Sequence, residues 1–253
     1  MPRASSLSSY RFLAGSDHAS SSHRGWDAGF DDIKTLGGSD TVKGKSSYNT
    51  GVNIYGAGSI DTGYGDDTIA GTSSGLYTSG IRNHGEILCG YGNDTVIGAS
   101  TGIGGGIENL DLGLIDTGDG NDVVTGTTSW KDYAGIHNDG TISTGRGNDV
   151  IDTIGGFGGF GVYKMGRGGD TLKGFGPGWF YGDQGTDKIL LRDGIYEIFA
   201  TNEYSRHGVK TSIVKNDVSM SIYGFELIGG VDGGLFALRE GTLTVANGIA
   251  MLN

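Results

Sequence analysis

Aspartates that recur at a fixed spacing are the residues of this chain whose type and position could do chemistry together. Each follows a short glycine-rich turn, and each precedes a large apolar residue by two positions. The intervals between them are 27, 27, 28, 27, 21 and 17 residues, at Asp40, Asp67, Asp94, Asp122, Asp149, Asp170 and Asp187. Because the first four intervals are nearly constant, the sequence predicts that these carboxylates form one row.

The turns before these aspartates run Gly-x-Gly-(Asn/Asp/Gly)-Asp, as in Gly90-Tyr91-Gly92-Asn93-Asp94. Glycine adopts positive φ at little cost, so such a turn can aim several carbonyl oxygens at one point. Calcium prefers six to eight hard oxygen ligands at about 2.3–2.6 Å. The pattern therefore predicts Ca²⁺ as the cofactor, bound by the aspartates above and by the turns of the central glycines Gly65, Gly92, Gly120, Gly147 and Gly168.

Electrostatics favours a cation in such a row. If the turns stack in neighbouring coils, their carboxylates lie about 4.8 Å apart. Two like charges at that distance repel by roughly 3 kcal/mol at an effective dielectric constant of 20, and a cation between them would turn repulsion into cross-linking. The alternative is a metal-free row, in which each Asp only accepts hydrogen bonds from backbone amides, as in an Asx-turn.

Three apolar columns recur with the same period and indicate the elements that position the aspartates. Three inward columns imply three short strands per coil, with successive coils pairing in parallel. The sequence thus predicts an all-β protein, a right-handed parallel β-helix or β-roll-like solenoid. A row of Asn83, Asn109 and Asn138 is expected to hydrogen-bond along the stack. The columns comprise Val42, Ile69, Val96, Val124 and Ile151; Ile60, Ile87, Ile115 and Ile142; and Val52, Ile81, Ile107 and Ile136.

Changes in composition along the chain predict three regions. Residues 1–36 are expected to be an N-terminal cap or a partly disordered lead. Residues 37–190 hold the repeats, although the period shortens after Asp149 and the coils are expected to tighten there. Residues 191–253 contain less glycine and more alternating apolar residues, which is typical of a β-rich C-terminal cap that blocks edge pairing and of a possible secretion signal.

Composition and charge exclude several classes of protein. Glycine supplies 52 of 253 residues, and proline only 2, which excludes collagen. A net charge of −11 disfavours nucleic-acid binding, and the single Cys89 cannot form an intrachain disulfide. No apolar run is long enough for a transmembrane segment, and residues 1–22 do not resemble a cleavable signal peptide.

The turns resemble the hemolysin-type (RTX) calcium-binding nonapeptide Gly-Gly-x-Gly-x-Asp-x-U-x, where U is a large apolar residue. The segment from Gly166 to Leu191 is the most similar to it, and the resemblance covers residues 37–191. It implies a secreted, extracellular protein that folds on binding calcium after export by type I secretion machinery. The chain departs from the family pattern at the first glycine of the motif, which is replaced by Thr62, Cys89, Thr117, Thr144 or Met165.

The main alternative function is catalysis. Several β-helix proteins of similar architecture act on acidic polysaccharides as lyases or epimerases, which need a base and a cation near a sugar carboxylate. The candidate group is Arg82, His84, Lys131, Tyr133 and His137, with His84 and His137 expected at equivalent positions. Such a placement beside the Asn row more often means a solvated face or a satisfied hydrogen bond, so no catalytic residue is assigned. The prediction is a calcium-binding structural or adhesive protein, with a cell-surface polysaccharide as a further possible partner.

Overall fold

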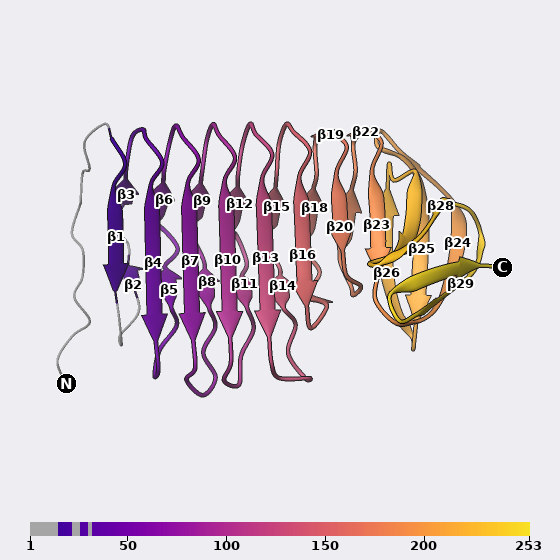
Figure 1. Cartoon of the computed structure of the whole chain (residues 1–253), viewed down its shortest axis with the longest axis horizontal. Coiled ribbons are helices and arrows are strands. Elements are labelled where there is room, and N and C mark those ends of the chain that lie inside the picture. The colour runs from indigo at the N-terminus through magenta and orange to yellow at the C-terminus, as the bar shows by residue number, and fades with distance from the viewer. Residues whose placement is uncertain (1–14, 22–25, 30–31) are drawn as a thin grey trace.

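The computed structural model describes residues 15–21, 26–29 and 32–253, and these residues form a parallel β-solenoid with a β-rich end (Figure 1). The all-β solenoid fold predicted from the sequence is therefore confirmed. The other residues of the expected N-terminal cap or lead lie outside the described residues. No helix of the described residues has the length and hydrophobicity that crossing a membrane requires.

Each full coil contributes one strand to each of three faces. We use the name face A for the sheet formed by the longest strands of the coils. Each of its strands begins close after a ladder aspartate or its equivalent. Its strands pair in parallel from coil to coil. They are β1 (His18–Ser21), β4 (Thr41–Ser46), β7 (Thr68–Ser73), β10 (Thr95–Ser100), β13 (Val123–Thr128), β16 (Val150–Ile154), β20 (Thr171–Lys173), β23 (Lys188–Leu191) and β27 (Leu227–Gly230).

Faces B and C complete the coils. Face B ends at β17, whereas face C continues into the C-terminal region. Face B consists of β2 (Trp26–Gly29), β5 (Val52–Ile54), β8 (Ile81–Asn83), β11 (Ile107–Asn109), β14 (Ile136–Asn138) and β17 (Phe157–Gly158). Face C consists of β3 (Asp32–Lys34), β6 (Ser59–Asp61), β9 (Glu86–Leu88), β12 (Leu114–Asp116), β15 (Thr141–Ser143), β18 (Val162–Lys164), β21 (Trp179–Tyr181) and β26 (Val218–Tyr223).

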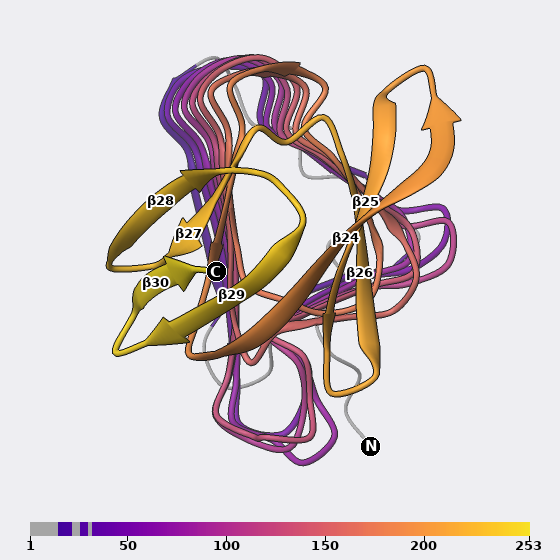
Figure 2. The ribbon, with the colours of Figure 1, turned by 90° about the vertical axis from the view of Figure 1, so that its right-hand side faces the viewer.

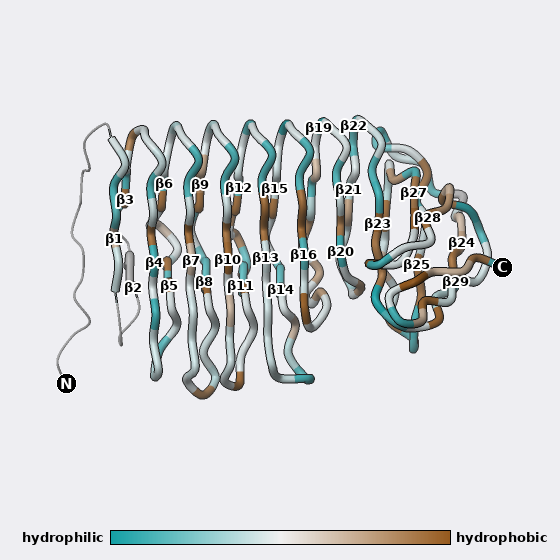
Figure 3. The backbone as a smooth tube through the Cα atoms, in the orientation of Figure 1, coloured by the Kyte–Doolittle hydropathy of each residue, from teal (hydrophilic) through white to brown (hydrophobic). Residues whose placement is uncertain are grey.

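The three predicted apolar columns form the core, and all of their members are fully buried. Figure 3 shows the apolar segments at the same height in successive coils. The first column is kept in strict register, since Val96 pairs with Ile69 on one side and with Val124 on the other. Every second residue of a strand points inward, and in each coil this inward side chain meets the same neighbours. An apolar residue at every second position of the strands, repeated every 27 residues, therefore specifies this fold.

The coils tighten after Asp149, as the shorter intervals predicted. The first shortened coil keeps only the two-residue face B strand β17 and the next coil has none, while larger aromatic side chains fill the interior. Tyr163 stacks on Phe180 with ring centroids 4.4 Å apart, and Phe157 packs against both rings. The Phe-Gly run from Ile154 to Gly161 therefore closes the wide part of the solenoid.

The C-terminal region caps the last coil and extends its ladders. Strand β26 pairs in parallel with β21, and β27 pairs with β23. The remaining strands pair mainly antiparallel, which ends the parallel stack. They are β24 (Gly194–Ser205), β25 (Gly208–Lys215), β28 (Gly233–Ala237), β29 (Gly241–Ala246) and β30 (Ile249–Leu252). Seen from this end, the β24–β25 hairpin projects from the body of the coils (Figure 2).

The coil repeat also extends below residue 37. Strands β1, β2 and β3 pair in parallel with β4, β5 and β6, so the described residues between 18 and 34 form a further coil. A short ladder of β19 (Arg167–Gly168) and β22 (Gln184–Gly185) runs along the turns.

Candidate functional site

The glycine-rich turns form one edge of the solenoid, between faces C and A. Gly92 has a φ of 129°, and a Cβ at this residue would lie 2.0 Å from the carbonyl oxygen of Gly65 in the preceding coil. Only glycine tolerates both conditions. The turns therefore stack backbone on backbone, which brings the aspartates that follow them into one row.

The predicted aspartates form a continuous buried ladder along this edge. The Oδ1 atom of each accepts a hydrogen bond from the backbone N–H of the ladder residue in the preceding coil; for example, Asp67 donates to Asp94 at 2.8 Å and Asp94 to Asp122 at 2.7 Å. The same contact joins all the predicted aspartates from Asp40 to Asp187. Their side chains thus bond the coils together, as the metal-free alternative also requires.

The second carboxyl oxygen of each ladder residue is buried and has no hydrogen-bond partner. An unpaired buried carboxylate oxygen is costly, because it has lost water and gained nothing in exchange. A row of such atoms requires a positive charge or a proton at each coil. Among the described residues, these atoms are Oδ2 of Asp17, Asp40, Asp67, Asp94, Asp122, Asp149, Asp170 and Asp187.

Burial makes these carboxyl groups hard to ionise. The pKa of Asp94 and that of Asp149 are raised to about 7, chiefly by desolvation and also by the charges of neighbouring ladder residues, while hydrogen bonds from the backbone lower them in part. The pKa of Asp187 is also raised to about 7, and that of Asp67 and Asp170 to about 6, again chiefly by burial. Ionising the whole ladder therefore costs free energy unless a positive charge compensates it.

A side chain at the start of most turns stands beside the free oxygen. A Cβ at Gly182 would lie 2.7 Å from Oδ2 of Asp187, so this position points at the carboxyl group. The equivalent positions carry buried Thr, Cys or Met side chains, and the Thr62 hydroxyl also donates toward the carbonyl of Cys89 at 3.4 Å. In the last coil, where this residue is glycine, the carbonyl oxygen of Gly224 closes the same position, since it would lie 2.3 Å from a Cβ at Gly182. The equivalent residues are Thr35, Thr62, Cys89, Thr117, Thr144 and Met165.

Two neighbouring ladder carboxyl groups could supply part of the oxygen shell that calcium needs. Coils about 4.8 Å apart would place a cation midway between two Oδ2 atoms at about 2.4 Å from each, a normal calcium–oxygen distance. The described residues contain no cluster of three or more His, Cys, Asp or Glu side chains that could hold a metal. Further ligands would have to be turn carbonyls, which already accept coil-to-coil bonds but have a second lone pair, as at Tyr91, which accepts from Gly65.

A second row of polar side chains runs outside the ladder and was not predicted. The side chain of Asp66 accepts from the N–H of Asn93 at 2.7 Å, Asn93 from Asn121 at 2.9 Å, and Asn121 from Asn148 at 2.7 Å. These bonds point in the opposite direction to those of the inner ladder. Each Asn-Asp pair therefore clamps its coil to both neighbours, and the repeated Asn before Asp was the signal in the sequence.

Two members of the inner ladder were also missed. Asp17 accepts from no earlier described residue but donates its N–H to Asp40 at 2.7 Å, and the N–H of Asp187 donates to Glu226 at 2.7 Å. The signals were present, because Gly15-Ser16-Asp17 repeats Gly38-Ser39-Asp40, and Glu226 precedes an apolar residue by two positions as the aspartates do.

The predicted Asn ladder is confirmed. The amide of Asn83 donates to Asn109 at 2.8 Å, and that of Asn109 donates to Asn138 at 2.8 Å. All three side chains are fully buried. This row fixes the turn between faces B and C, opposite the aspartates.

The candidate catalytic group is dispersed among other contacts. Arg82 pairs with Glu108 at 3.5 Å, and His137 with Asp139 at 2.8 Å. The expected equivalence of the two histidines is wrong, since His137 lies in register with Glu108 and Arg82, whereas His84 follows the Asn ladder and stacks on Tyr55. Lys131 lines a separate cavity of about 590 Å³ with Arg192, Tyr196 and Lys215. Tyr133 lies in the loop between β13 and β14.

Comparisons of the chain with models of protein families, with curated proteins and with solved structures find no match.

Proposed function

We propose that this chain is a structural or adhesive solenoid that works outside the cell and is stabilised by calcium along its Asp ladder. The observation that carries the proposal is the row of buried Oδ2 atoms, one per coil, without any partner. The residues that would hold the ions are the ladder aspartates, together with carbonyl oxygens of the glycine turns.

The chemistry links stability to location. Extracellular calcium modules typically bind at about 10⁻⁴ to 10⁻³ M. Sites of that affinity are empty at cytoplasmic calcium concentrations and filled outside, so the coils would lock only after export. The resemblance of the turns to RTX repeats supports this order of events and type I secretion machinery as the route. A repetitive, rigid surface also suits adhesion to a cell-surface polysaccharide.

The number of sites is expected to be smaller than the number of aspartates. The Thr, Cys and Met side chains beside most of the free oxygens occupy space that a full calcium shell needs. At the last coil, Gly182 places no side chain beside Asp187, and Glu226 adds a further carboxylate to the end of the ladder. We therefore place the tightest site at the last coil.

Thermal unfolding followed by far-UV circular dichroism tests the proposal. Melts are recorded at pH 8 in millimolar calcium, in millimolar magnesium and in excess EDTA. Calcium is expected to raise the melting temperature well above the values in EDTA and in magnesium. Coincident curves in all three buffers would show that protons alone neutralise the ladder, and the calcium proposal would be rejected.

A further inference from the structure

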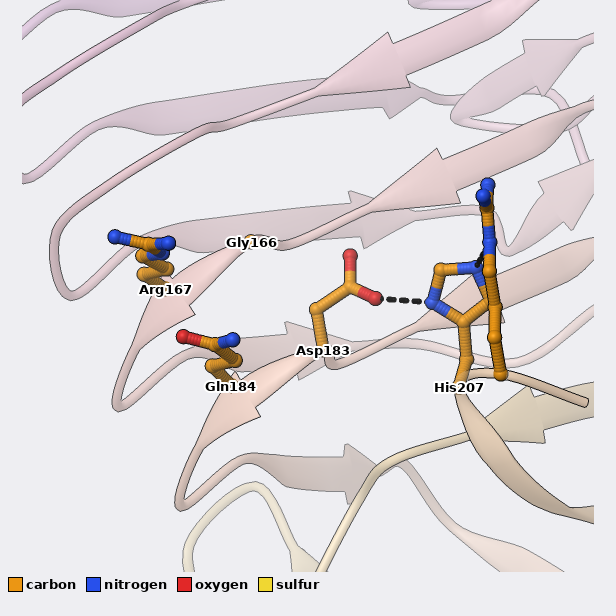
Figure 4. Close-up of a pocket in the computed structure, with 6 residues that line it drawn as sticks. Gly166, Arg167, Asp183, Gln184 and His207 are labelled. Atoms are coloured by element: carbon orange, nitrogen blue, oxygen red, sulfur yellow. Dashed lines mark hydrogen bonds and ion pairs between the residues drawn. The ribbon is translucent and has the colours of Figure 1, made fainter.

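A cavity of about 410 Å³ lies at the junction of the solenoid and its cap, away from the buried oxygens of the ladder. It is lined by Gly166, Arg167, Asp183, Gln184, Arg206 and His207. The first four belong to the turn edge of the last two coils, and the last two form the tip of the β24–β25 hairpin. Figure 4 shows Arg167 and Gln184 on one side of Asp183 and His207 on the other.

Asp183 occupies a position at which the other turns have glycine. Gly90, Gly118, Gly145 and Gly166 all have positive φ, and Asp183 follows them with a φ of 68°. A non-glycine residue is uncommon in this region and is a reason to look for a role. Its side chain reaches the hairpin, where Oδ1 lies 2.5 Å from Nδ1 of His207.

The hydrogen bonds at the hairpin tip have a fixed direction. Arg206 donates from Nε to Nε2 of His207 at 2.9 Å. Because a guanidinium only donates, Nε2 must accept, and the ring proton is therefore on Nδ1, from which it is donated to Asp183. Asp183 and His207 thus hold the Arg206 guanidinium in place, while its terminal nitrogens have no partner among the described residues.

The charges of the cavity are unusual for this chain. Within the described part of the molecule, Arg82, Arg146 and Arg192 each pair with a carboxylate, whereas Arg167, Arg206 and the distant Arg239 have no such pair. Two unpaired arginines at one cavity of a protein with a net charge of −11 favour an anionic ligand. Arginine suits carboxylates in particular, because its planar group donates two parallel hydrogen bonds.

The rest of the cavity indicates what carries the carboxylate. Gln184 and the second oxygen of Asp183 can bond hydroxyl groups from both sides. His207 supplies the aromatic ring of the cavity lining; behind it lies Tyr181, which stacks on the largely buried Tyr223 at 4.9 Å. Polar groups beside flat rings suit a pyranose, whose edge is hydroxylated and whose faces are apolar.

We propose that this cavity binds an acidic sugar unit of a polysaccharide, with Arg206 and Arg167 contacting carboxylates and Gln184 contacting hydroxyls. The volume lies within the range of small-molecule sites. The two arginines come from different elements on either side of Asp183, so an extended acidic chain fits better than a compact phosphate ion. Asp183 and His207 are positioning residues. None of the six lining residues is a ladder aspartate.

Isothermal titration calorimetry with a glucuronate trisaccharide tests the proposal, in whichever of the calcium and EDTA buffers preserves the β-sheet circular dichroism signal. This choice keeps the outcome separate from that of the calcium proposal. The arms are the parent protein with the acidic trisaccharide, with a neutral glucose trisaccharide and with inorganic phosphate. Saturable binding of the acidic sugar alone, weakening as salt is added, is expected.

Variants locate the binding. Arg206→Gln and Arg167→Gln are each expected to weaken it by about tenfold or more, because each removes charge-assisted hydrogen bonds. The charge-matched control is Arg239→Gln, which alters an exposed arginine outside this cavity and should change the affinity less than twofold. Asp183→Gly restores the residue of the other turns; it should weaken binding while the melting temperature is kept, which a merely structural role would not produce.

Three results would overturn the proposal. The first is no saturable heat with the acidic trisaccharide for a folded protein at millimolar ligand. The second is phosphate binding as tight as the sugar, which would show a simple anion site. The third is an equal loss of affinity in Arg239→Gln, which would show that net charge and not the cavity attracts the ligand.

Discussion

At the scale of single residues, the two oxygens of each ladder carboxyl group have different tasks. The Oδ1 atom of Asp122 accepts the N–H of Asp94 at 2.7 Å, whereas Oδ2 is buried and unpaired. An asparagine in place of the aspartate keeps an acceptor for the N–H and removes the charge. An alanine removes both. The two substitutions therefore separate the hydrogen bond from the charge.

We expect Asp122→Ala to lower the free energy of unfolding by about 1–3 kcal/mol in calcium and in EDTA, because it leaves the N–H of Asp94 buried without a partner. Asp122→Asn should instead raise the stability in EDTA at pH 8, by about 1 kcal/mol, because no buried charge remains. It should also reduce the additional stability that calcium provides. Urea unfolding with and without calcium measures both. A full calcium response in Asp122→Asn would mean that this carboxylate binds no ion.

The raised pKa values predict an unusual pH dependence for the calcium-free protein. Asp67 and Asp94 have pKa values of about 6 and about 7 in the folded state, against 3.8 for an ordinary Asp. Between these limits the folded chain binds more protons than the unfolded chain, so the stability falls as the pH rises. In EDTA, the melting temperature at pH 5 should exceed that at pH 8. Saturating calcium should reduce or remove the difference, since the ion replaces the protons.

A melting temperature in EDTA that increases from pH 5 to pH 8 would contradict this ladder chemistry. The measurement needs a control for the carboxylates outside the ladder. Their salt bridges make the folded protein more stable as the pH rises, which is the opposite of the effect expected from the ladder. The Asp122→Asn variant supplies part of this control, because it has one ionisable ladder residue fewer. The melting temperature of this variant in EDTA should therefore depend less on pH than that of the parent.

At the scale of elements, the coils are held in register by polar rows as well as by the apolar columns. The amide of Asn109 donates to Asn138 at 2.8 Å and to the carbonyl of Gly113 at 3.0 Å, and it accepts from Asn83. We expect Asn109→Ala to lower the free energy of unfolding by about 2 kcal/mol or more, since it leaves several buried groups unpaired.

The neighbouring Glu108→Ala is the control for Asn109→Ala. Glu108 lies on the same strand, β11, but its half-buried side chain points outward and forms an ion pair with the exposed Arg82. Its loss should change the stability by less than about 1 kcal/mol. Denaturation in urea compares the two variants, and similar losses would show that the Asn row is not a specific clamp.

The coils could be predicted from the sequence because each depends on local repetition. A glycine turn, an Asp and an apolar residue two positions later define face A wherever they recur, and the Asn row follows from the same period. Asp17 escaped notice because its interval to Asp40 is 23 residues and not 27. The cavity beside the hairpin tip could not be predicted, because Asp183 and His207 meet only through the tertiary packing of a hairpin against the last coils.

At the scale of the whole molecule, the solenoid is a stack of coils, and an uncovered end of this stack can associate with other chains. Parallel ladders end in unpaired backbone groups, which bind other strands unless they are covered. At the C-terminal end, β26 covers β21 and β27 covers β23, while antiparallel strands stop further growth. The cap thus resembles a coil where it meets the stack and differs from one beyond it. The sequence of β26 does not contain the repeat of the coils, and for this reason its pairing with β21 could not be predicted.

We expect deletion of residues 192–253 to cause association through the exposed β21 and β23 edges, because Phe180 and Ile189 lose their covering strands. Size-exclusion chromatography with light scattering at micromolar concentration measures the mass. The matched control replaces only the hairpin tip, residues 201–210, by a two-residue turn, which leaves β26 and β27 on the last coil and should keep the mass of the parent. If the truncated chain has the same association state as the parent, the C-terminal strands contribute stability without protecting an edge, and their role as a cap is wrong.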